Sequence, residues 1–384
     1  MTRLLPVSVL AAGVIGSSWV ISSGAAPQAP SFPSQVDLVM VDVVVTDKAG
    51  RPVPDLAATD FVLAEERRPQ TIVSFRSVGS AAVSAEGAPD AAAELKAPNG
   101  APGQVFLIVF DDVHIEPLQT TTAQAAVERF LSSGVQPADT VAILAPGAEM
   151  QLLSRSGADR SPLLAGVRRL RGLKIVDPCQ QVTEFEAMRF SLGIEGPSVR
   201  RPSAFRENTA CPASGFLDAR AIHEQAQRRD STTLAAIAAA FPAFQDAPGK
   251  RSVILVSPGF VDDPSLRAEF QAVLRRSLGS LAALYFADVR GLVGVFETDR
   301  VGGGIALAEE AGGTDRLASE TGGFAIHSTN DLGRALLRIA DEGRVYYILG
   351  YAPSDQAKPG SYRRIEVRVR RPGLKVRARP GYVR

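Results

Sequence analysis

The segment VFLIVFDDVHIEP, residues 105–117, constrains the fold more than any other part of the chain. Its first six residues are all apolar, which is typical of a strand covered on both faces of a parallel sheet. Further apolar strands follow, and segments with helical apolar spacing alternate with them. We therefore predict an α/β fold with a doubly wound, mostly parallel, Rossmann-like sheet over residues 104–343.

The sequence on either side of this region has a different pattern. Residues 36–78 and residues 344–384 alternate apolar and polar side chains between turn signals, as strands with one solvated face do. The C-terminal segment is too small to bury a core alone, so we expect the two segments to form one additional small β-sandwich. Residues 79–103 are rich in Ala, Pro and Gly and are predicted to be a linker.

Residues 1–26 have the pattern of an export signal peptide, with Arg3 before an apolar segment and small residues near Ala25. Cleavage there predicts a periplasmic or secreted protein. The alternative is an uncleaved segment, which would be the protein's only contact with a membrane. The net charge is +1 and no basic cluster is interleaved with aromatic residues, which argues against nucleic acid as a partner.

The chain has two cysteines, Cys179 and Cys211. Both fall in a segment of weak periodicity, residues 175–228, which is predicted to be an insert in the α/β domain. In an exported protein the two cysteines are expected to form a disulfide, and the alternative is two free thiols.

Four candidate metal ligands follow the first buried strand: Asp111, Asp112, His114 and Glu116. Ligands of open α/β sheets bind beyond the carboxyl ends of the strands, which is where these residues are expected. Three roles are open to them: they hold a metal, they take part in chemistry, or they only end the strand. Carboxylates favour Mg²⁺, whereas imidazole favours zinc, manganese or iron. A transition metal on Asp112, His114 and Glu116 is therefore one alternative to Mg²⁺.

Four further residues are expected at the same edge of the sheet and are candidates for a rim that binds a partner: Ser257, Asp262, Asp288 and Arg290. Arg290 either clamps a carboxylate of the partner or pairs with Asp288. Among the other histidines, His223 is predicted to be solvated and His327 to be structural.

Ser257, His114 and Asp112 also allow a hydrolase hypothesis, with a nucleophile, a base and an orienting group. The sequence around the serine, VSPGF, is not the Gly-x-Ser-x-Gly turn of α/β-hydrolases, which weakens this alternative.

The chain resembles the von Willebrand factor type A (VWA)-related proteins of the acidobacterial type. The resemblance covers nearly everything after the signal segment, and the segments that carry it are VDVVVTDKAGRPVPDLAATDFVLAEERRPQTIVSF, FLIVFDDVHI, GKRSVILVSPGF, ALYFADVRGL, LASETGGFAIHSTNDL and YYILGYAPSD with SYRRIEVRVRRPGLKVRARPGY. It implies a doubly wound fold and an extracytoplasmic adhesion or scaffolding role.

Type A domains usually carry a metal-ion-dependent adhesion site. The motif is Asp-x-Ser-x-Ser after the first strand, a threonine from a later loop and an aspartate after the fourth strand. If Asp112 is the first position here, His114 and Glu116 replace the two serines, and if Asp111 is first, neither serine is present. The resemblance therefore implies a degenerate site.

The other two positions of the motif also depart from the family. Ser257 and Pro258 stand where the second aspartate is expected, and Thr232 or Thr233 is the candidate threonine. We expect an exported, non-enzymatic module that needs no cofactor and binds a protein partner at the carboxyl edge of the sheet. The alternatives are an adhesion protein with a working Mg²⁺ or Mn²⁺ site and, less favoured, the hydrolase.

Overall fold

The computed structural model describes residues 38–79, 103–147, 153–156, 159–177, 180, 182–194, 215–244, 249–292, 308–353 and 361–383. Asp37–Arg384 forms one compact unit. The predicted signal peptide, most of the predicted linker, and Cys179 and Cys211 lie outside the described residues, so those predictions stand as made. Within the described residues, no helix has the length and apolar character needed to cross a membrane.

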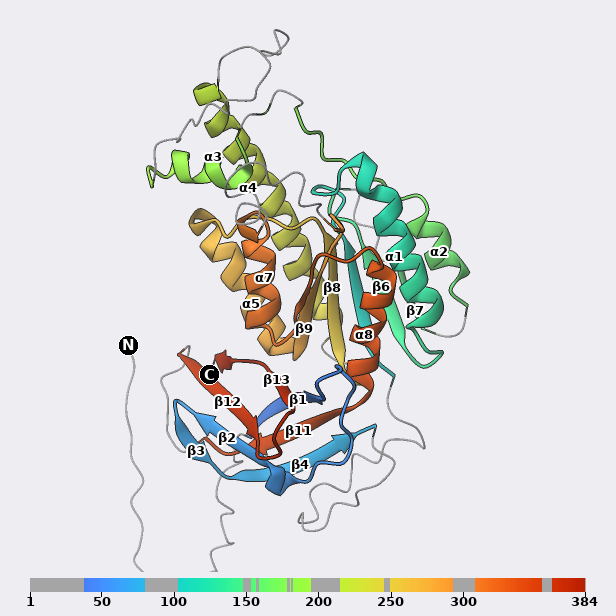
Figure 1. Cartoon of the computed structure of the whole chain (residues 1–384), viewed down its shortest axis with the longest axis vertical. Helices are drawn as coiled ribbons and strands as arrows, with labels where there is room; N and C mark the ends of the chain where they lie inside the picture. The colour runs from blue at the N-terminus through green and yellow to red at the C-terminus, as the bar shows by residue number, and fades with distance from the viewer. Residues whose placement is uncertain are drawn as a thin grey trace, which may run out of the picture. The chain divides into compact units, whose positions relative to one another are not determined.

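The α/β domain is built on a six-stranded sheet with the strand order β10-β9-β8-β5-β6-β7 (Figure 1). The first five strands in this order pair in parallel, and the edge strand β7 pairs antiparallel with β6. The mostly parallel sheet predicted from the sequence is confirmed. The strands are β5 (Val105–Phe110), β6 (Thr140–Leu144), β7 (Leu153–Ser156), β8 (Arg251–Ser257), β9 (Ala282–Asp288) and β10 (Ala325–Ile326).

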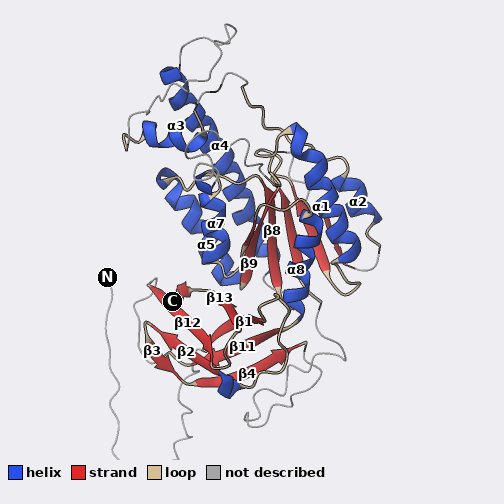
Figure 2. Ribbon diagram, in the orientation of Figure 1, coloured by secondary structure: helices blue, strands red, loops and turns tan. Residues whose placement is uncertain are grey.

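Helices cover both faces of this sheet (Figure 2). One face packs against α1 (Thr120–Ser133), α2 (Ser161–Val167) and α8 (Leu332–Arg344). The other packs against α4 (Gly215–Ala240), α5 (Arg267–Ser280) and α7 (Gly312–Glu320). Even-numbered residues of β5 belong to the first core and odd-numbered residues to the second, because successive side chains of a strand point to opposite faces. This is why all six must be apolar.

Helix α4 begins at Gly215, inside the predicted insert, and continues without a break past residue 228 to Ala240. The predicted end of the insert is therefore not a structural boundary. The polar stretch ARAIHEQAQRR consists mainly of good helix formers. Because many of its side chains are charged or polar, the spacing of apolar residues did not show that the helix begins before it. Helix α3 (Glu184–Ser191) packs against α4.

Strands from both ends of the chain form the predicted β-sandwich. One sheet has the order β13-β1-β11-β4 and the other the order β14-β12-β2-β3. N-terminal and C-terminal strands pair directly, β1 with β11 and β2 with β12, and they share one apolar core. The strands are β1 (Val39–Thr46), β2 (Phe61–Glu65), β3 (Arg68–Gln70), β4 (Ile72–Val78), β11 (Tyr346–Tyr351), β12 (Tyr362–Val369), β13 (Lys375–Ala378) and β14 (Gly381–Val383).

The hairpin between β2 and β3 turns on Glu66 and Arg67, which both have positive φ, 48° and 64°. A two-residue turn of this kind favours glycine at its second position, because other side chains crowd the backbone there. We expect Arg67→Gly to raise the free energy of unfolding by about 0.5–1 kcal/mol, measured by urea titration. Arg68→Gly, one residue later in β3, should lower it, and a loss of stability in Arg67→Gly would contradict the prediction.

Candidate functional site

Five buried polar residues meet where β5 and β8 end, and we call them the Asp111 cluster: Asp111, His114, Asp230, Thr233 and Ser257. Asp111 and His114 lie in the turn after β5, Ser257 is the last residue of β8, and Asp230 and Thr233 project from α4. None of the five is more than 2% exposed. The cluster therefore lies beneath the carboxyl edge of the sheet rather than on it.

The turn after β5 brings His114 back onto Asp111. The Asp111 amide donates to the carbonyl of Val256 in β8, which extends the strand pairing by one residue. The amides of His114 and Ile115 then both donate to the Asp111 carbonyl, which closes a tight turn. The imidazole and the carboxylate, three residues apart, are thereby placed side by side.

The Asp111 carboxylate accepts three hydrogen bonds from side chains. Ser257 Oγ donates at 2.6 Å, Thr233 Oγ1 at 2.7 Å and His114 Nδ1 at 2.9 Å. The other ring nitrogen of His114, Nε2, lies 2.8 Å from Oδ1 of Asp230. Because each ring nitrogen faces a carboxylate, the arrangement favours the doubly protonated, positively charged imidazole.

Burial by itself would lower the pKa of His114, but the charge of Asp111 and the hydrogen bonds to Asp111 and Asp230 raise the pKa to about 9. Burial alone would raise the pKa of Asp111, yet the His114 charge and the bonds from His114, Ser257 and Thr233 hold it below the usual value. Burial raises the pKa of Asp230. At neutral pH the cluster therefore contains a charged imidazolium beside an ionised Asp111.

Of the four predicted metal ligands, the structure brings Asp111 and His114 together, whereas Asp112 and Glu116 bond elsewhere or lie apart. Oδ1 of Asp112 accepts a hydrogen bond from the amide of Gly147 at 2.7 Å, and Glu116 lies partly exposed at the start of a short 3-10 helix. No group of three histidine, cysteine or acidic residues suited to a metal occurs among the described residues. Nδ1 and Nε2 of His114 face the carboxylates of Asp111 and Asp230, so both ring nitrogens already have partners.

Thr233, rather than Thr232, is the threonine that reaches Asp111. The Thr232 hydroxyl donates instead to the Arg228 carbonyl on its own helix, at 2.7 Å. Asp111 after β5, Thr233 on α4 and Ser257 at the end of β8 thus converge, and the His114 ring completes the group. Because the ring carries a positive charge, it supplies the neutralisation that a cation would give Asp111.

The predicted hydrolase arrangement is not formed. Ser257 Oγ donates to Asp111, His114 bonds to Asp111 and Asp230, and Asp112 bonds elsewhere. Ser257 is also 0% exposed, so a substrate carbonyl has no path to its hydroxyl in this structure. The sequence placed all three residues at the correct edge but could not give the directions of their side chains.

The predicted rim is only partly at the surface. Asp288 is buried and accepts from Arg290 Nη2 at 2.7 Å, so the predicted alternative of an Asp288–Arg290 pair is confirmed. Asp262 is exposed and pairs with Arg316 at 3.1 Å. Ser257 and Asp288 therefore do not present their side chains to a partner.

Both remaining histidines also bond to aspartates. His327 lies between Asp288 and Asp315, at 3.1 and 2.8 Å. His223 was predicted to be solvated, but it is buried and bonds to Asp263 at 2.7 Å. The correction follows from the length of α4, which carries His223 alongside the loop that follows β8.

Several exposed apolar side chains lie on loops near the carboxyl edge of the sheet. Leu173 and Lys174 donate backbone hydrogen bonds to Asp112 and Ile115, which ties the segment after α2 to the turn after β5. Lys174 Nζ also pairs with Glu184 of α3 at 2.7 Å. We call the exposed apolar residues of these loops, of the end of α3 and of the segment after β9 the edge patch: Leu118, Leu173, Ile175, Val176, Leu192, Ile194 and Leu292.

Sequence reasoning placed the binding surface at this edge, in residues 111–117, 257–263, 288–292 and 177–228, but it singled out neither Asp230 nor the individual apolar residues of the edge patch. Asp230 lies three residues before Thr233, on the same face of α4, and that spacing was the available signal. The edge patch left no such signal, because isolated apolar residues in loops look the same in sequence whether they are buried or exposed.

No protein-family model matches this sequence, and no curated protein matches it. One similar solved structure is that of an aerotolerance-related membrane protein from Bacteroides fragilis NCTC 9343, with multiple mutations to serines. The similarity covers 62% of this chain and 98% of that chain, at 12% sequence identity and a TM-score of 0.33. Values this low do not support transfer of fold or function from that protein.

Proposed function

We propose that this chain is an exported, VWA-type protein-binding module that engages a protein partner through the edge patch without a metal ion. The observation that carries the proposal is the presence of several exposed apolar side chains on loops near the carboxyl edge of the sheet. Leu118 is 92% exposed and Ile175 is 84% exposed. Exposed apolar side chains that form a patch are typical of protein interaction sites, and we propose that these residues form one.

The Asp111 cluster supports the metal-independent part of the proposal. In a metal-dependent adhesion site the cation stays under-neutralised, so that an acidic group of the partner completes its coordination. Here the imidazolium of His114 already neutralises Asp111, and both are fully buried. The cluster thus acts as a rigid support beneath the edge loops, and recognition falls to the residues above it.

The test uses charge insertion into the edge patch. Ile175→Glu and Leu118→Glu place a carboxylate where we expect an apolar contact, whereas Val73→Glu does so at an exposed residue of β4 in the sandwich. We expect both edge variants to lose a partner from the protein's native extracytoplasmic fraction, with affinity reduced about 30-fold or more. Val73→Glu should retain the partner, and circular dichroism should show all three variants folded.

Addition of a chelator should leave partner binding by the wild-type protein unchanged. Loss of the partner on chelation would overturn the metal-independent reading, and retention by both edge variants would overturn the proposed surface. Turnover of a generic ester, peptide or phosphate substrate that disappears in Ser257→Ala would replace the proposal with the hydrolase.

A further inference from the structure

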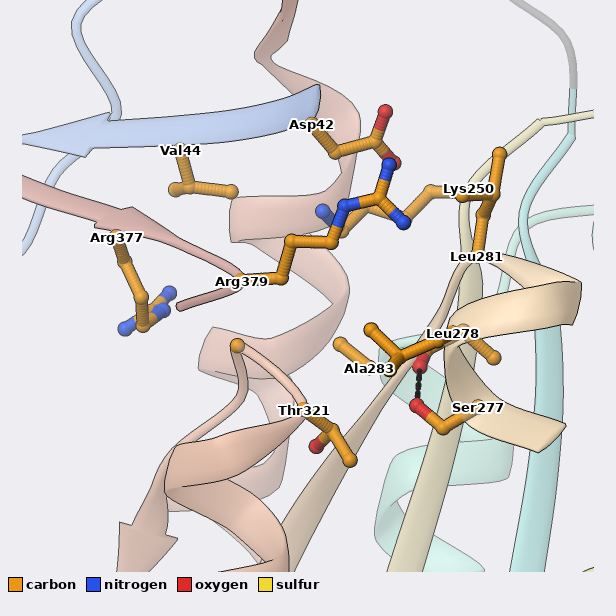
Figure 3. A pocket seen from close by; sticks show the side chains of 12 residues that line it. Asp42, Val44, Lys250, Ser277, Leu278, Leu281, Ala283, Thr321, Arg377 and Arg379 are labelled. Atoms are coloured by element: carbon orange, nitrogen blue, oxygen red, sulfur yellow. Dashed lines mark hydrogen bonds between the residues drawn. The ribbon is translucent and has the colours of Figure 1, made fainter. Parts of the chain in front are cut away.

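A small pocket lies at the opposite edge of the parallel sheet, where the amino ends of β8 and β9 meet β1 and β13 of the sandwich (Figure 3). Its cavity volume is about 30 Å³. A single buried water needs roughly 10–15 Å³ by the same kind of measure, so a group somewhat larger than one water fits. The pocket is remote from the edge patch and independent of the function proposed for it.

The lining of this pocket contains more positive than negative charge. Lys250, Arg377 and Arg379 line it, and Asp42 is the only acidic residue among the described residues that do so. Arg377 already donates to the buried carboxylate of Glu342 and lies over the ring of Phe324. Among the described lining residues, the carboxylate of Asp42 is thus the one negative charge beside the two cations Lys250 and Arg379.

Lys250 is buried without an ion pair among the described residues. It is 7% exposed, and the contact its ammonium group makes there is with the face of the Tyr346 ring, at 5.0 Å. Lysine is almost never buried to this extent unless an anion compensates its charge. This ammonium group is the strongest sign that the pocket is suited to an anion.

Arg379 is also short of acceptors. Its Nη2 donates to the backbone carbonyl of Met40, but its Nε is buried and has no hydrogen-bond partner in the described part of the chain. Burial lowers the pKa of Arg379, and the charge of Asp42 opposes that shift. Figure 3 shows the side chains of Arg379, Asp42 and Lys250, which all line this pocket.

We propose that this pocket binds a phosphate-sized oxyanion between Lys250 and Arg379. Arginine offers a planar pair of donors and lysine a point charge, a combination suited to phosphate or sulfate oxygens. Lys250 belongs to the α/β domain and Arg379 to the sandwich, so the anion bridges the two. The turn after α7 approaches Arg379 as well, because a Cβ on Gly322 would lie 2.9 Å from the Arg379 amide nitrogen.

The first test is thermal unfolding of the wild-type protein in increasing inorganic phosphate, with chloride keeping the ionic strength constant. We expect a saturable rise in Tm of about 2–4 °C. The rise should be lost in Lys250→Met and Arg379→Gln. It should persist in Arg368→Gln, because Arg368 is exposed on β12 and pairs with Glu366. No rise in the wild type, or an equal rise in all four proteins, would overturn the proposal.

A second test does not require removing either cation. Leu278 lines the pocket from α5 and is partly exposed, so a longer polar side chain is tolerated there. Leu278→Glu places a carboxylate in the pocket, and Leu278→Gln is its uncharged match. In chloride we expect the Glu variant to have the higher Tm of the two and to show no further rise with phosphate. A higher Tm for the Gln variant, or an undiminished phosphate effect in the Glu variant, would contradict an anion site.

Titration calorimetry then separates the possible sources of the anion. Phosphate, sulfate and acetate are each titrated into the wild-type protein and into Arg379→Gln. Saturable binding of the tetrahedral anions to the wild type alone supports the proposal. Preferential binding of acetate would overturn it in favour of a carboxylate site.

Discussion

Replacing His114 by leucine is expected to lower the free energy of unfolding by about 3–5 kcal/mol, which is the cost of breaking a buried ion pair by removing one partner. Leucine fills a similar volume, but it leaves Asp111 and Asp230 buried without the ring that bonds to both. Urea titration monitored by circular dichroism measures the loss. His327→Leu is the matched control, and it should cost much less because that ring is half-buried.

A double variant tests the cause of the loss. Asp111→Asn in the His114→Leu background removes the unpaired buried charge while keeping the acceptor oxygen for Ser257 and Thr233. We expect it to regain part of the lost stability. If the two substitutions instead add their costs, the His114–Asp111 interaction is not the ion pair described here.

The second large effect is on the pH dependence of stability. The pKa of His114 is raised to about 9 in the folded protein, from an ordinary value of 6.5. Between these values the folded state keeps a proton that the unfolded state has released, so stability falls as the pH rises. The contribution of His114 is complete below pH 6.5 and lost on passing through pH 9, a decrease on the order of 3 kcal/mol.

Urea titrations at pH 6, 7, 8 and 9 measure this decrease. In His114→Leu the decrease in the free energy of unfolding should be much smaller. The remaining decrease comes from His327, whose pKa is also raised to about 9 but whose contribution is reduced by solvent screening. A wild-type stability that stays level from pH 6.5 to 9 would mean that His114 is neutral in the folded protein. At the acid end the sign reverses, because the pKa of Asp111 is lowered and its contribution disappears as the pH falls below the ordinary value.

The sequence was most informative where a residue's type follows from its position in the fold. Residues 105–110 are apolar because β5 is covered on both faces, so both the strand and the parallel sheet could be predicted. The alternation in residues 362–369 likewise predicted a strand with one solvated face. The pairing of the two β segments was expected from size, because the C-terminal segment is too small to bury a core alone.

The candidate site was harder to predict because it depends on the direction of side chains. Asp111, His114 and Ser257 were assigned to the correct edge, since all three follow or end parallel strands. Their burial could not be predicted, because α4 covers them. The first half of α4 is polar, so the length of this helix was not evident from the sequence. Lys250 was not predicted to be of interest. It stands directly before a strand, and its burial without an ion pair among the described residues is visible only in the folded chain.

The place where the chain leaves and re-enters the sandwich has a consequence for the order of folding. The chain leaves the sandwich at the end of β4 and returns as β11, and Val78 pairs with Tyr346 at that point. The same β11 also pairs with β1, so it lies between two strands made much earlier. During synthesis, β1 to β4 must therefore wait for the entire α/β domain to be made. We expect that domain to fold first, and the sandwich to close only after β11 to β14 have been released.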